Sequence, residues 1–450
     1  MIPVEGPAHA SDVPAGRAAC PVCWRDAGEG LAPFEQLPDE LKQLISANAP
    51  GALRGVCGRC LELFGRAQAQ SQKYAAVFEQ GRQVLPTWLR LGAHEHFTGR
   101  GVTIAFLDSG FYPHPDLTTP HSRILAYHNV VPKGTGTLED IDPASWHGMM
   151  TSVVAAGNGA LSGGFFRSIS PDCNVVLVKV SKSGHIPEKN IERGLSWVIE
   201  NRERFGIRVV NISAGGDEEQ SYLDNSLCQT VERAVGEGLV VVCAVGNAGW
   251  SPGHPVLPPA SSPSSVAVGG LNDQNSLDRA RHSLYRSSYG PTVDGLQKPE
   301  VIAPGIWVPA PILPQTPTAA EAELYAKLDR ARDDELLPLI EEHKDVDRDI
   351  YDARTLPKYL IRQLVSVKLH ENDVISEHYK FVDGTSFAAP VVSSTVACML
   401  EANPHLTPQR VKRILIDTAE RLPQVEIDRQ GWGVIAPRRA VETALSLRPQ

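Results

Sequence analysis

From about residue 85 onward, short apolar runs alternate with longer segments that have the amphipathic spacing of helices. The apolar runs are rich in β-branched residues and are bounded by glycine-rich connections, as expected of buried strands. Since parallel strands need crossover helices, this alternation predicts an α/β domain with a mostly parallel sheet and helices on both faces. The predicted strands cover residues 102–107, 175–180, 208–212 and 239–245, and the predicted helices between them include 190–204 and 226–236.

Polar residues lie at, or shortly after, the ends of three of the predicted strands. Asp108 follows the first strand, the segment Ser213-Ala214-Gly215 follows the third, and Asn247 comes shortly after the fourth. Ligands of open α/β sheets bind beyond the carboxyl ends of the strands, and these ends share one edge of the sheet. We therefore expect these residues to converge on one functional site.

Two further polar residues stand where predicted helices begin. His147 precedes a small, apolar run at residues 149–157, and Ser386 precedes a helical pattern at residues 391–401. At the first turn of a helix, unpaired backbone N–H groups and the helix dipole favour a developing negative charge. A serine hydroxyl is a poor nucleophile at neutral pH unless a base takes its proton and a third group orients that base. His147 and Asp108 are the candidates for these two roles.

Three blocks of the sequence carry a resemblance to a known family. Asp-Ser-Gly at 108–110, His-Gly at 147–148 and Gly-Thr-Ser-Phe-Ala-Ala-Pro at 384–390 resemble, in this order, the signature blocks of the subtilisin-like serine peptidases, or subtilases. The resemblance spans about residues 85–450 apart from one insertion. It implies a subtilisin-like fold and the hydrolysis of peptide bonds through the aspartate, histidine and serine of these blocks.

The same resemblance implies roles for other residues. Asn247, within Gly-Asn-Ala-Gly, is similar to the family's oxyanion asparagine, and the backbone N–H of Ser386 would be the second donor. Ser213-Ala214-Gly215 resembles the segment along which an extended substrate pairs as a strand. The chemistry requires no cofactor. Calcium sites are common in the family, but no set of ligands in this sequence matches one, so calcium binding is left open.

Two Cys-x-x-Cys pairs lie near the amino terminus, Cys20 with Cys23 and Cys57 with Cys60. Tight turns of this kind aim two thiolates at one tetrahedral metal ion, which predicts a four-cysteine Zn²⁺ site. Its role would be structural, because four thiolates leave no open coordination position for water. Two separate turns with unrelated thiols, or a redox dithiol, are the alternatives that the sequence leaves open.

The chain divides into three parts in this interpretation. Residues 1–18 form a loose tail, residues 19–84 a zinc-binding module with helices, and residues 85–450 the peptidase domain. A charged region at about 311–380 interrupts the peptidase domain. Structureless loops of that length are uncommon in compact domains, so we interpret it as a helical insertion. It is either a lid or partner-docking element beside the active edge, or a tolerated surface insertion.

Charge and composition restrict the partners. The formal net charge of −9 argues against a general nucleic-acid binder. A locally basic stretch at 54–90 leaves a surface that binds nucleic acid or an acidic partner as an alternative to a solvated helix face. No membrane partner is expected, because we identify no apolar run of membrane-spanning length and no secretion signal. We therefore expect a cytoplasmic protein. The single cysteines are expected to be buried thiols, namely Cys173, Cys228, Cys243 and Cys398.

The sequence as a whole predicts an intracellular serine endopeptidase that acts on protein or peptide substrates. The insertion, or a protein partner that docks and activates, would gate it. The alternative from a different class is a catalytically silent protein that keeps the subtilase fold to bind peptides or partners. The presence of all four catalytic elements favours the enzyme.

Overall fold

The structure is a computed structural model that describes residues 20, 30–48, 54–58, 60–61, 64–65, 84–131, 137–182, 184–423 and 425–448. The chain forms two compact units. One contains Met1–Leu85 together with Asn275–Arg281, and the other contains Pro86–Gln274 together with His282–Gln450. We describe each unit by itself and call the second the peptidase domain.

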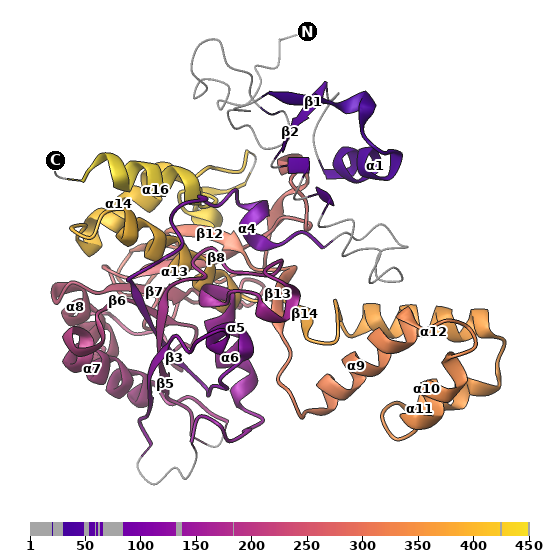
Figure 1. Ribbon diagram of the computed structural model, residues 1–450. Coiled ribbons are helices and arrows are strands. Elements are labelled where there is room, and N and C mark those ends of the chain that lie inside the picture. Colours follow the sequence, from indigo (N-terminus) through magenta and orange to yellow (C-terminus); the bar gives the residue numbers. More distant parts are fainter. Residues whose placement is uncertain are drawn as a thin grey trace. The chain divides into compact units, whose positions relative to one another are not determined.

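The peptidase domain is built around one twisted sheet (Figure 1). Its strands follow the order β12-β8-β7-β6-β3-β5-β4, and every neighbouring pair in this series is parallel. A short strand, β9, adds to β8 in the antiparallel direction. The bounds of the strands are β3 Thr103–Asp108, β4 Ile124–Asn129, β5 Asn174–Lys179, β6 Ile207–Ile212, β7 Val240–Ala244, β8 Val266–Asn272, β9 Ser283–Leu284 and β12 Val301–Pro304.

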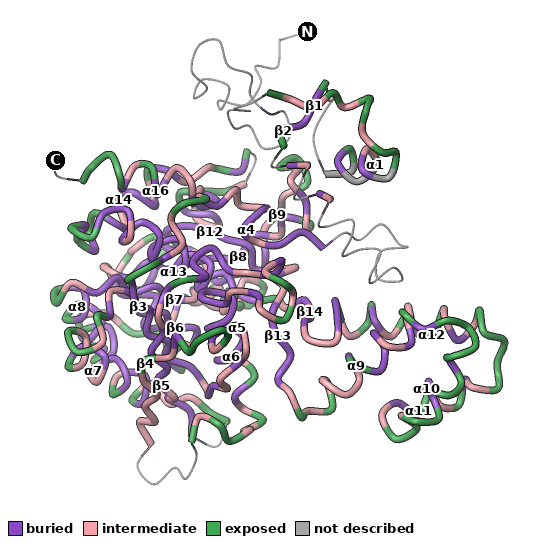
Figure 2. Tube along the Cα trace, in the orientation of Figure 1, coloured by how far each residue is buried: buried purple, intermediate pink, exposed green. Residues whose placement is uncertain are grey.

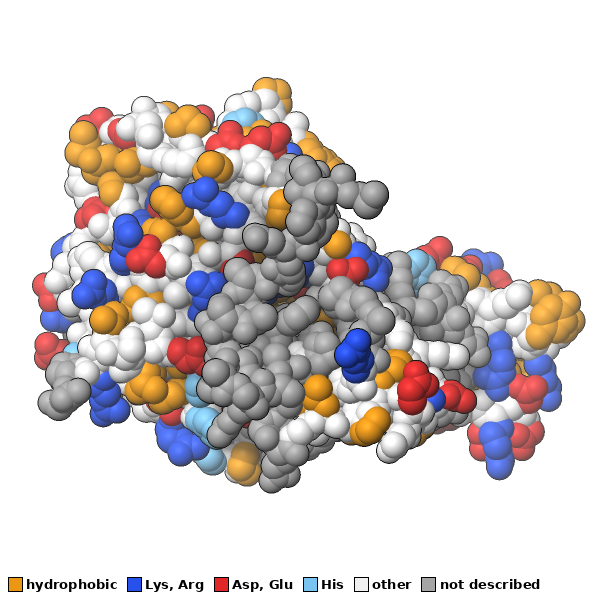
Figure 3. Space-filling model, turned by 90° about the horizontal axis from the view of Figure 1, so that it is seen from above, with side chains coloured by type: hydrophobic (Ala, Val, Ile, Leu, Met, Phe, Trp, Pro, Cys, Tyr) orange, Lys and Arg blue, Asp and Glu red, His pale blue; other side chains and the backbone are white. Residues whose placement is uncertain are grey.

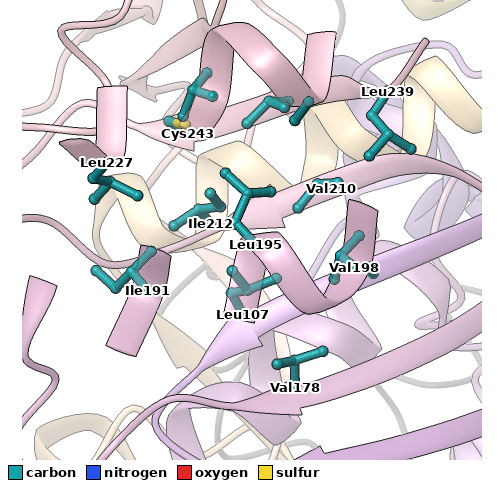
Figure 4. Packing of buried hydrophobic residues seen from close by; sticks show 14 of the residues in the cluster. Leu107, Val178, Ile191, Leu195, Val198, Val210, Ile212, Leu227, Leu239 and Cys243 are labelled. Carbon is teal, nitrogen blue, oxygen red and sulfur yellow. The ribbon is translucent and has the colours of Figure 1, made fainter. Parts of the chain in front are cut away.

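Helices cover both faces of this sheet. Because side chains alternate along a strand, Leu107, Val178 and Ile212 point to one face, where they pack with α7 (Glu188–Phe205) and α8 (Ser226–Gly236). Figure 4 shows Leu195 of α7 lying over these strand residues. The helices α6 (Ser145–Ala156) and α13 (Thr385–Ala402) pack with each other on the other face. The predicted fold class, an α/β domain with a mostly parallel sheet, is confirmed.

The helix α13 is the most deeply buried helix to carry a candidate site residue, and Figure 2 shows it inside the domain. It is long and apolar enough to cross a membrane by length and composition alone, with 89% of the segment buried inside the domain. The expectation that the chain has no apolar segment of membrane-spanning length was therefore wrong. A helix packed against the whole sheet must be apolar all round, and burial in a protein core produces the same composition as burial in lipid.

The remaining elements of the peptidase domain are short strands and peripheral helices. Arg90 of α4 (Thr87–Arg90) pairs with the buried Asp273 just beyond β8. The Thr407 hydroxyl caps α14 (Pro408–Thr418) directly before Pro408. The bounds are α4 Thr87–Arg90, α5 Pro115–Thr118, β10 Gly290–Pro291, β11 Gln297–Lys298, α14 Pro408–Thr418, α15 Ile427–Gln430 and α16 Pro437–Ser446.

The charged insertion is a small helical lobe, which we call the arm (residues 312–378). Its helices are α9 (Pro317–Arg330), α10 (Leu336–Glu342), α11 (Arg348–Asp352) and α12 (Lys358–Glu371). They contact mainly one another and enclose apolar side chains of their own, such as Leu328. Charged side chains of both signs are interspersed over its visible surface (Figure 3). An antiparallel pair forms its stem, β13 (Val308–Pro311) with β14 (Tyr379–Val382).

The first unit has few described elements. Strand β1 (Leu31–Pro33) pairs antiparallel with β2 (Gly55–Cys57), and α1 (Asp39–Asn48) lies between them in sequence. The segment 275–281, from the connection between β8 and β9, belongs to this unit, and the Leu85 N–H donates to the Asn275 side-chain oxygen at 3.0 Å. The predicted tail at 1–18 and the segment 66–83 of the predicted zinc-binding module lie outside the described residues.

Candidate active site

Asp108 is the last residue of β3 and is completely buried. One carboxylate oxygen, Oδ1, accepts a hydrogen bond from the Ser109 backbone N–H at 2.6 Å and lies 2.7 Å from His147 Nδ1. A buried carboxylate is stable only when its oxygens are hydrogen-bonded. This geometry fixes the imidazole tautomer, with the proton on Nδ1 and the other nitrogen, Nε2, available as a base.

The start of α6 brings His147 to this carboxylate. Gly148 follows the histidine, and a Cβ at this position would lie 2.1 Å from the Gly110 carbonyl oxygen and 3.0 Å from the Asp108 Cβ. Only glycine allows the helix to approach β3 this closely. The close approach of His147 to Asp108 therefore requires glycine at position 148.

The imidazole of His147 lies between two aromatic rings. The ring of Trp146 stands edge-on at a centroid distance of 5.2 Å, and the ring of Phe387 is tilted at 5.5 Å. Burial lowers the pKa of His147, whereas the charge of Asp108 and the hydrogen bond to it raise the pKa more, so the pKa lies above its ordinary value of 6.5. The side chain keeps 21% of its surface exposed, which leaves it accessible to a substrate.

Ser386 is the second residue of α13, and a proline four residues later affects its backbone. Pro390 has no N–H, so the Ser386 carbonyl oxygen lacks the usual helical donor. The Ser213 hydroxyl replaces that donor at 2.9 Å. The Ser386 hydroxyl in turn lies 3.5 Å from the Ser213 carbonyl oxygen. The predicted nucleophile and the predicted substrate-binding segment are therefore in direct contact.

Asn247 follows β7 and contacts the residue directly before Ser386. Its side-chain oxygen accepts hydrogen bonds from the backbone N–H and the hydroxyl of Thr385, at 2.9 and 3.0 Å. Because the amide is held through its oxygen, its nitrogen is the donor left for a ligand. That nitrogen is 3.8 Å from where a Cβ on Gly384 would lie. The amide is thus placed beside the first turn of α13.

The predicted substrate-binding segment begins where β6 ends. Ser213 is buried, and its hydroxyl accepts a hydrogen bond from the Asn211 amide at 3.0 Å, while Asn211 accepts one from the Ser393 hydroxyl at 3.0 Å. Ala214 is half-buried and Gly215 is exposed. The segment therefore leaves the core and offers its backbone at the surface, as strand addition by a peptide requires.

The structure thus brings the predicted residues together in two pairs, Asp108 with His147 and Ser386 with Ser213, and places Asn247 against Thr385. Sequence reasoning missed Thr151, which donates to Asp108 Oδ2 at 3.0 Å. The available signal was its position four residues after His147 in a predicted helix, which puts both side chains on one helix face.

The cysteines of the first unit form a separate cluster. The ligand atoms of Cys20, Cys57 and Cys60 all lie within 4.8 Å of one another, and all three residues are buried. Cys20 Sγ is 3.9 Å from Cys60 Sγ and accepts a hydrogen bond from the Cys57 backbone N–H at 3.4 Å. Cys23, the fourth predicted ligand, lies outside the described residues. The three thiols could together hold a metal ion.

Several known proteins are similar to this chain. The model of the Subtilase family matches residues 99–433. The serine protease AprX of Bacillus subtilis (strain 168) is 28% identical over 351 residues, which cover 76% of this chain and 67% of AprX. Subtilisin E of Bacillus subtilis (strain 168) is 32% identical over 214 residues, and the match spans 47% of this chain and about half (48%) of subtilisin E. The crystal structure of a cold adapted subtilisin-like serine proteinase aligns with a TM-score of 0.47 and 21% identity, covering 76% of this chain and 89% of that chain.

Proposed function

Because the chain belongs to the subtilase family, whose members are serine endopeptidases that need no cofactor for catalysis, we propose that it hydrolyses peptide bonds through Asp108, His147 and Ser386. The predicted resemblance and enzyme class are confirmed at the level of the family. The observation that carries the assignment of residues is the 2.7 Å contact between Asp108 and His147 at the carboxyl end of β3. An accessible histidine that a buried aspartate orients can act as the base for a serine nucleophile.

The steps follow from these roles. His147 Nε2 takes the Ser386 hydroxyl proton while the oxygen attacks the carbonyl carbon of the scissile peptide bond. Asp108 holds the imidazole and stabilises its protonated form. The imidazolium then gives its proton to the leaving amine, the C–N bond breaks, and an acyl-enzyme remains on Ser386. Water attacks the carbonyl carbon of this ester with His147 again as the base. The bond between that carbon and the Ser386 oxygen then breaks, His147 returns the proton to this oxygen, and the carboxyl product is released.

The negative charge that develops on the substrate oxygen needs fixed donors. The Asn247 amide nitrogen and the Ser386 backbone N–H are the donors we assign. The support is that Thr385 holds the Asn247 oxygen with two hydrogen bonds, so the amide does not need to reorganise when charge develops. The Ser386 N–H belongs to the first turn of α13, where no helical carbonyl is available to it.

The substrate is a protein or peptide, as for the family, and we assign its binding to Ser213, Ala214 and Gly215. The exposed backbone at Gly215 supports pairing with an extended chain. Backbone pairing would give affinity that depends little on the substrate sequence.

The test is labelling of the purified protein with a fluorophosphonate probe and cleavage of unfolded casein, for the wild type beside Ser386→Ala. We expect both activities in the wild type and neither in the variant. The exposed Ser446→Ala, which removes a hydroxyl bonded only to the Thr443 carbonyl, is the matched control and should behave as the wild type. A wild type that neither labels nor cleaves, although folded, would identify the silent peptide-binding alternative.

We extend the proposal to gating by the arm or by a partner that docks on it. The support is that the stem of the arm leads directly into the nucleophile segment. β14 ends at Val382, and the Gly384 N–H donates to the carbonyl of Gly305, just before β13, at 2.8 Å. A gate should discriminate by size. If the arm gates the site, a protein that docks on the arm should raise the rate of casein cleavage relative to the rate of cleavage of a short chromogenic peptide. If the arm has no such role, the ratio of the two rates should stay constant.

We propose Zn²⁺ as the ion of the cysteine cluster, held by Cys20, Cys57 and Cys60 with Cys23 as the fourth ligand. Zinc–sulfur bonds of about 2.3 Å in a tetrahedron place sulfurs about 3.8 Å apart. The 3.9 Å separation of Cys20 and Cys60 fits this geometry. The ion would stabilise the module and take no part in the hydrolysis. Elemental analysis should find about one zinc per chain, and Cys57→Ser should lose it.

For localisation, we propose the cytoplasm. The support comes from four cysteines of the peptidase domain that are buried thiols rather than disulfides, which suits a reducing compartment. Burial raises the pKa of Cys173 to about 11, which keeps its thiol protonated and unreactive. Fractionation of cells that express the protein from its own promoter tests the assignment, and recovery outside the cell would contradict it.

A further inference from the structure

One residue of α6 contacts the candidate triad and has no role in the mechanism above. Thr151 follows His147 by four residues, so one turn of helix places both side chains on the same face of α6. That face meets the end of β3. His147 Nδ1 is 2.7 Å from Asp108 Oδ1, and the Thr151 hydroxyl is 3.0 Å from Asp108 Oδ2. The two residues together hold both oxygens of one carboxylate.

Burial makes this second contact important. Asp108 and Thr151 are both completely inaccessible to solvent. The Ser109 N–H and His147 both serve Oδ1, and among the described residues Thr151 is the donor to Oδ2. Without it, a buried oxygen of a charged group would have no hydrogen-bond partner, an arrangement that proteins avoid.

The Thr151 hydroxyl has a choice of acceptors but only one proton. It lies 3.1 Å from the Gly148 carbonyl oxygen of the preceding turn, as well as 3.0 Å from Asp108 Oδ2. A carboxylate is the stronger acceptor because it is charged. The neighbouring Ser152 is a useful contrast, since it is equally buried but, among the residues that the structure describes, its hydroxyl donates to the Met149 carbonyl alone, at 2.9 Å.

We propose that Thr151 is a positioning residue for the triad, which fixes the carboxylate plane of Asp108 so that Oδ1 stays aligned with His147 Nδ1. The proposal rests on the proposed function, because it matters only if His147 acts as a base. A carboxylate held at one oxygen can rotate about its terminal torsion, which is a soft degree of freedom. Held at both oxygens, it cannot rotate without breaking the bond to Thr151.

The first test compares the steady-state kinetics of Thr151→Val, Thr151→Ser and the control Ser152→Ala. Valine keeps the shape of threonine and removes the hydroxyl. We expect kcat to fall by about tenfold or more with KM unchanged, since a hydrogen bond to a charged group is lost at the base and not at the substrate. Serine should restore most of kcat, and Ser152→Ala should match the wild type. An unchanged kcat in Thr151→Val, or an equal loss in Ser152→Ala, would overturn the proposal.

The second test does not need activity. The pKa of His147 is measured by NMR in the Ser386→Ala background, with and without Thr151→Val. Asp108 is the charged group that acts on this imidazole, and it raises the pKa against the opposing effect of burial. Misalignment of Asp108 should therefore lower the pKa of His147 and shift the acidic limb of kcat to lower pH. A rise in this pKa would overturn the proposal, because it would show that Thr151 only screens the carboxylate charge. Failure of the wild type to cleave would instead count against the proposed function and leave this readout intact.

Discussion

The peptidase domain and the amino-terminal cysteine module are organised on different physical principles. In the peptidase domain, strands buried on both faces carry side chains such as Leu107 and Val178 that are fully inaccessible to solvent. The described part of the module has two three-residue strands, the helix α1, a 3-10 turn at Phe34–Gln36, and a small number of buried apolar residues such as Ile45 and Phe64. A segment of this size has a small hydrophobic core and is marginally stable on that core alone. The comparison is consistent with the proposal that metal ligation adds to the stability of the module, whereas burial of apolar side chains stabilises the peptidase domain.

The largest expected effect is that of metal removal on the module. Structural zinc binding contributes on the order of 10 kcal/mol to the folding of small zinc domains. Treatment with a chelator should therefore abolish the protection of amides around Cys57 in hydrogen exchange. Protection of β3 and β5 should not change. Loss of amide protection in both regions at once would contradict the idea that the module and the peptidase domain are stabilised independently.

The reverse experiment truncates the core of the peptidase domain. Leu195 is fully buried between α7 and the sheet, and Leu195→Ala should lower the free energy of unfolding by about 2–5 kcal/mol. Zinc content should stay that of the wild type. Leu337→Ala on the arm, where 43% of the side chain is exposed, is the matched control and should change stability by less than about 0.5 kcal/mol. Thermal denaturation of the three proteins gives the comparison.

Within the peptidase domain, a substitution at the candidate site should change catalysis far more than it changes stability. Asn247→Ala removes the proposed donor for the developing oxyanion and should lower kcat by about 100- to 1000-fold, a magnitude that was measured on a subtilisin. The free energy of unfolding should fall by far less, because the hydrogen bonds that the Asn247 oxygen accepts within the described structure come from Thr385 alone. Asn201→Ala on the surface of α7 is the control. A kcat within tenfold of the wild type would remove Asn247 from the mechanism.

The smallest expected effect concerns the pH at which kcat falls on the acidic side of the activity profile. The pKa of His147 lies above 6.5, so the imidazole becomes protonated, and kcat falls, as the pH drops through that raised value. The sign for stability is the opposite. A raised pKa in the folded state contributes stability that is fully present below about pH 6.5 and is lost as the pH rises through the folded pKa. A limb centred below pH 6 would contradict the assignment of His147 as the base held by Asp108.

The sequence predicts the peptidase domain well where the signals are local. The helix at 226–236 and the strand at 175–180 have the expected period and agree with α8 and β5 to within a residue. The arm was harder. Two of its helices, α10 and α11, are too short to show a helical period, although Asp347 caps α11 by accepting from two backbone N–H groups. A capping aspartate was the one local signal for that helix.

The candidate site was predictable to the extent that it depends on residue type and strand ends. Asp108 and His147 meet because the end of β3 and the start of α6 converge, and their neighbouring glycines indicate the close approach. The contacts of Thr151 and Ser213 could not be read from single motifs, because they depend on the register between a helix and the sheet. Long-range register is set by packing and is absent from local patterns.

The stem of the arm has a consequence for how such proteins diversify. Pro311 and Tyr379 face each other across an antiparallel ladder, so the chain leaves the domain and returns to it at a single point. A hairpin turn of about two residues would close the same ladder, and an exchanged lobe would attach to it equally well. The position is therefore a permissive graft site in the scaffold. Lineages could vary the appendage, and protein engineers could replace it, without moving a strand of the central sheet.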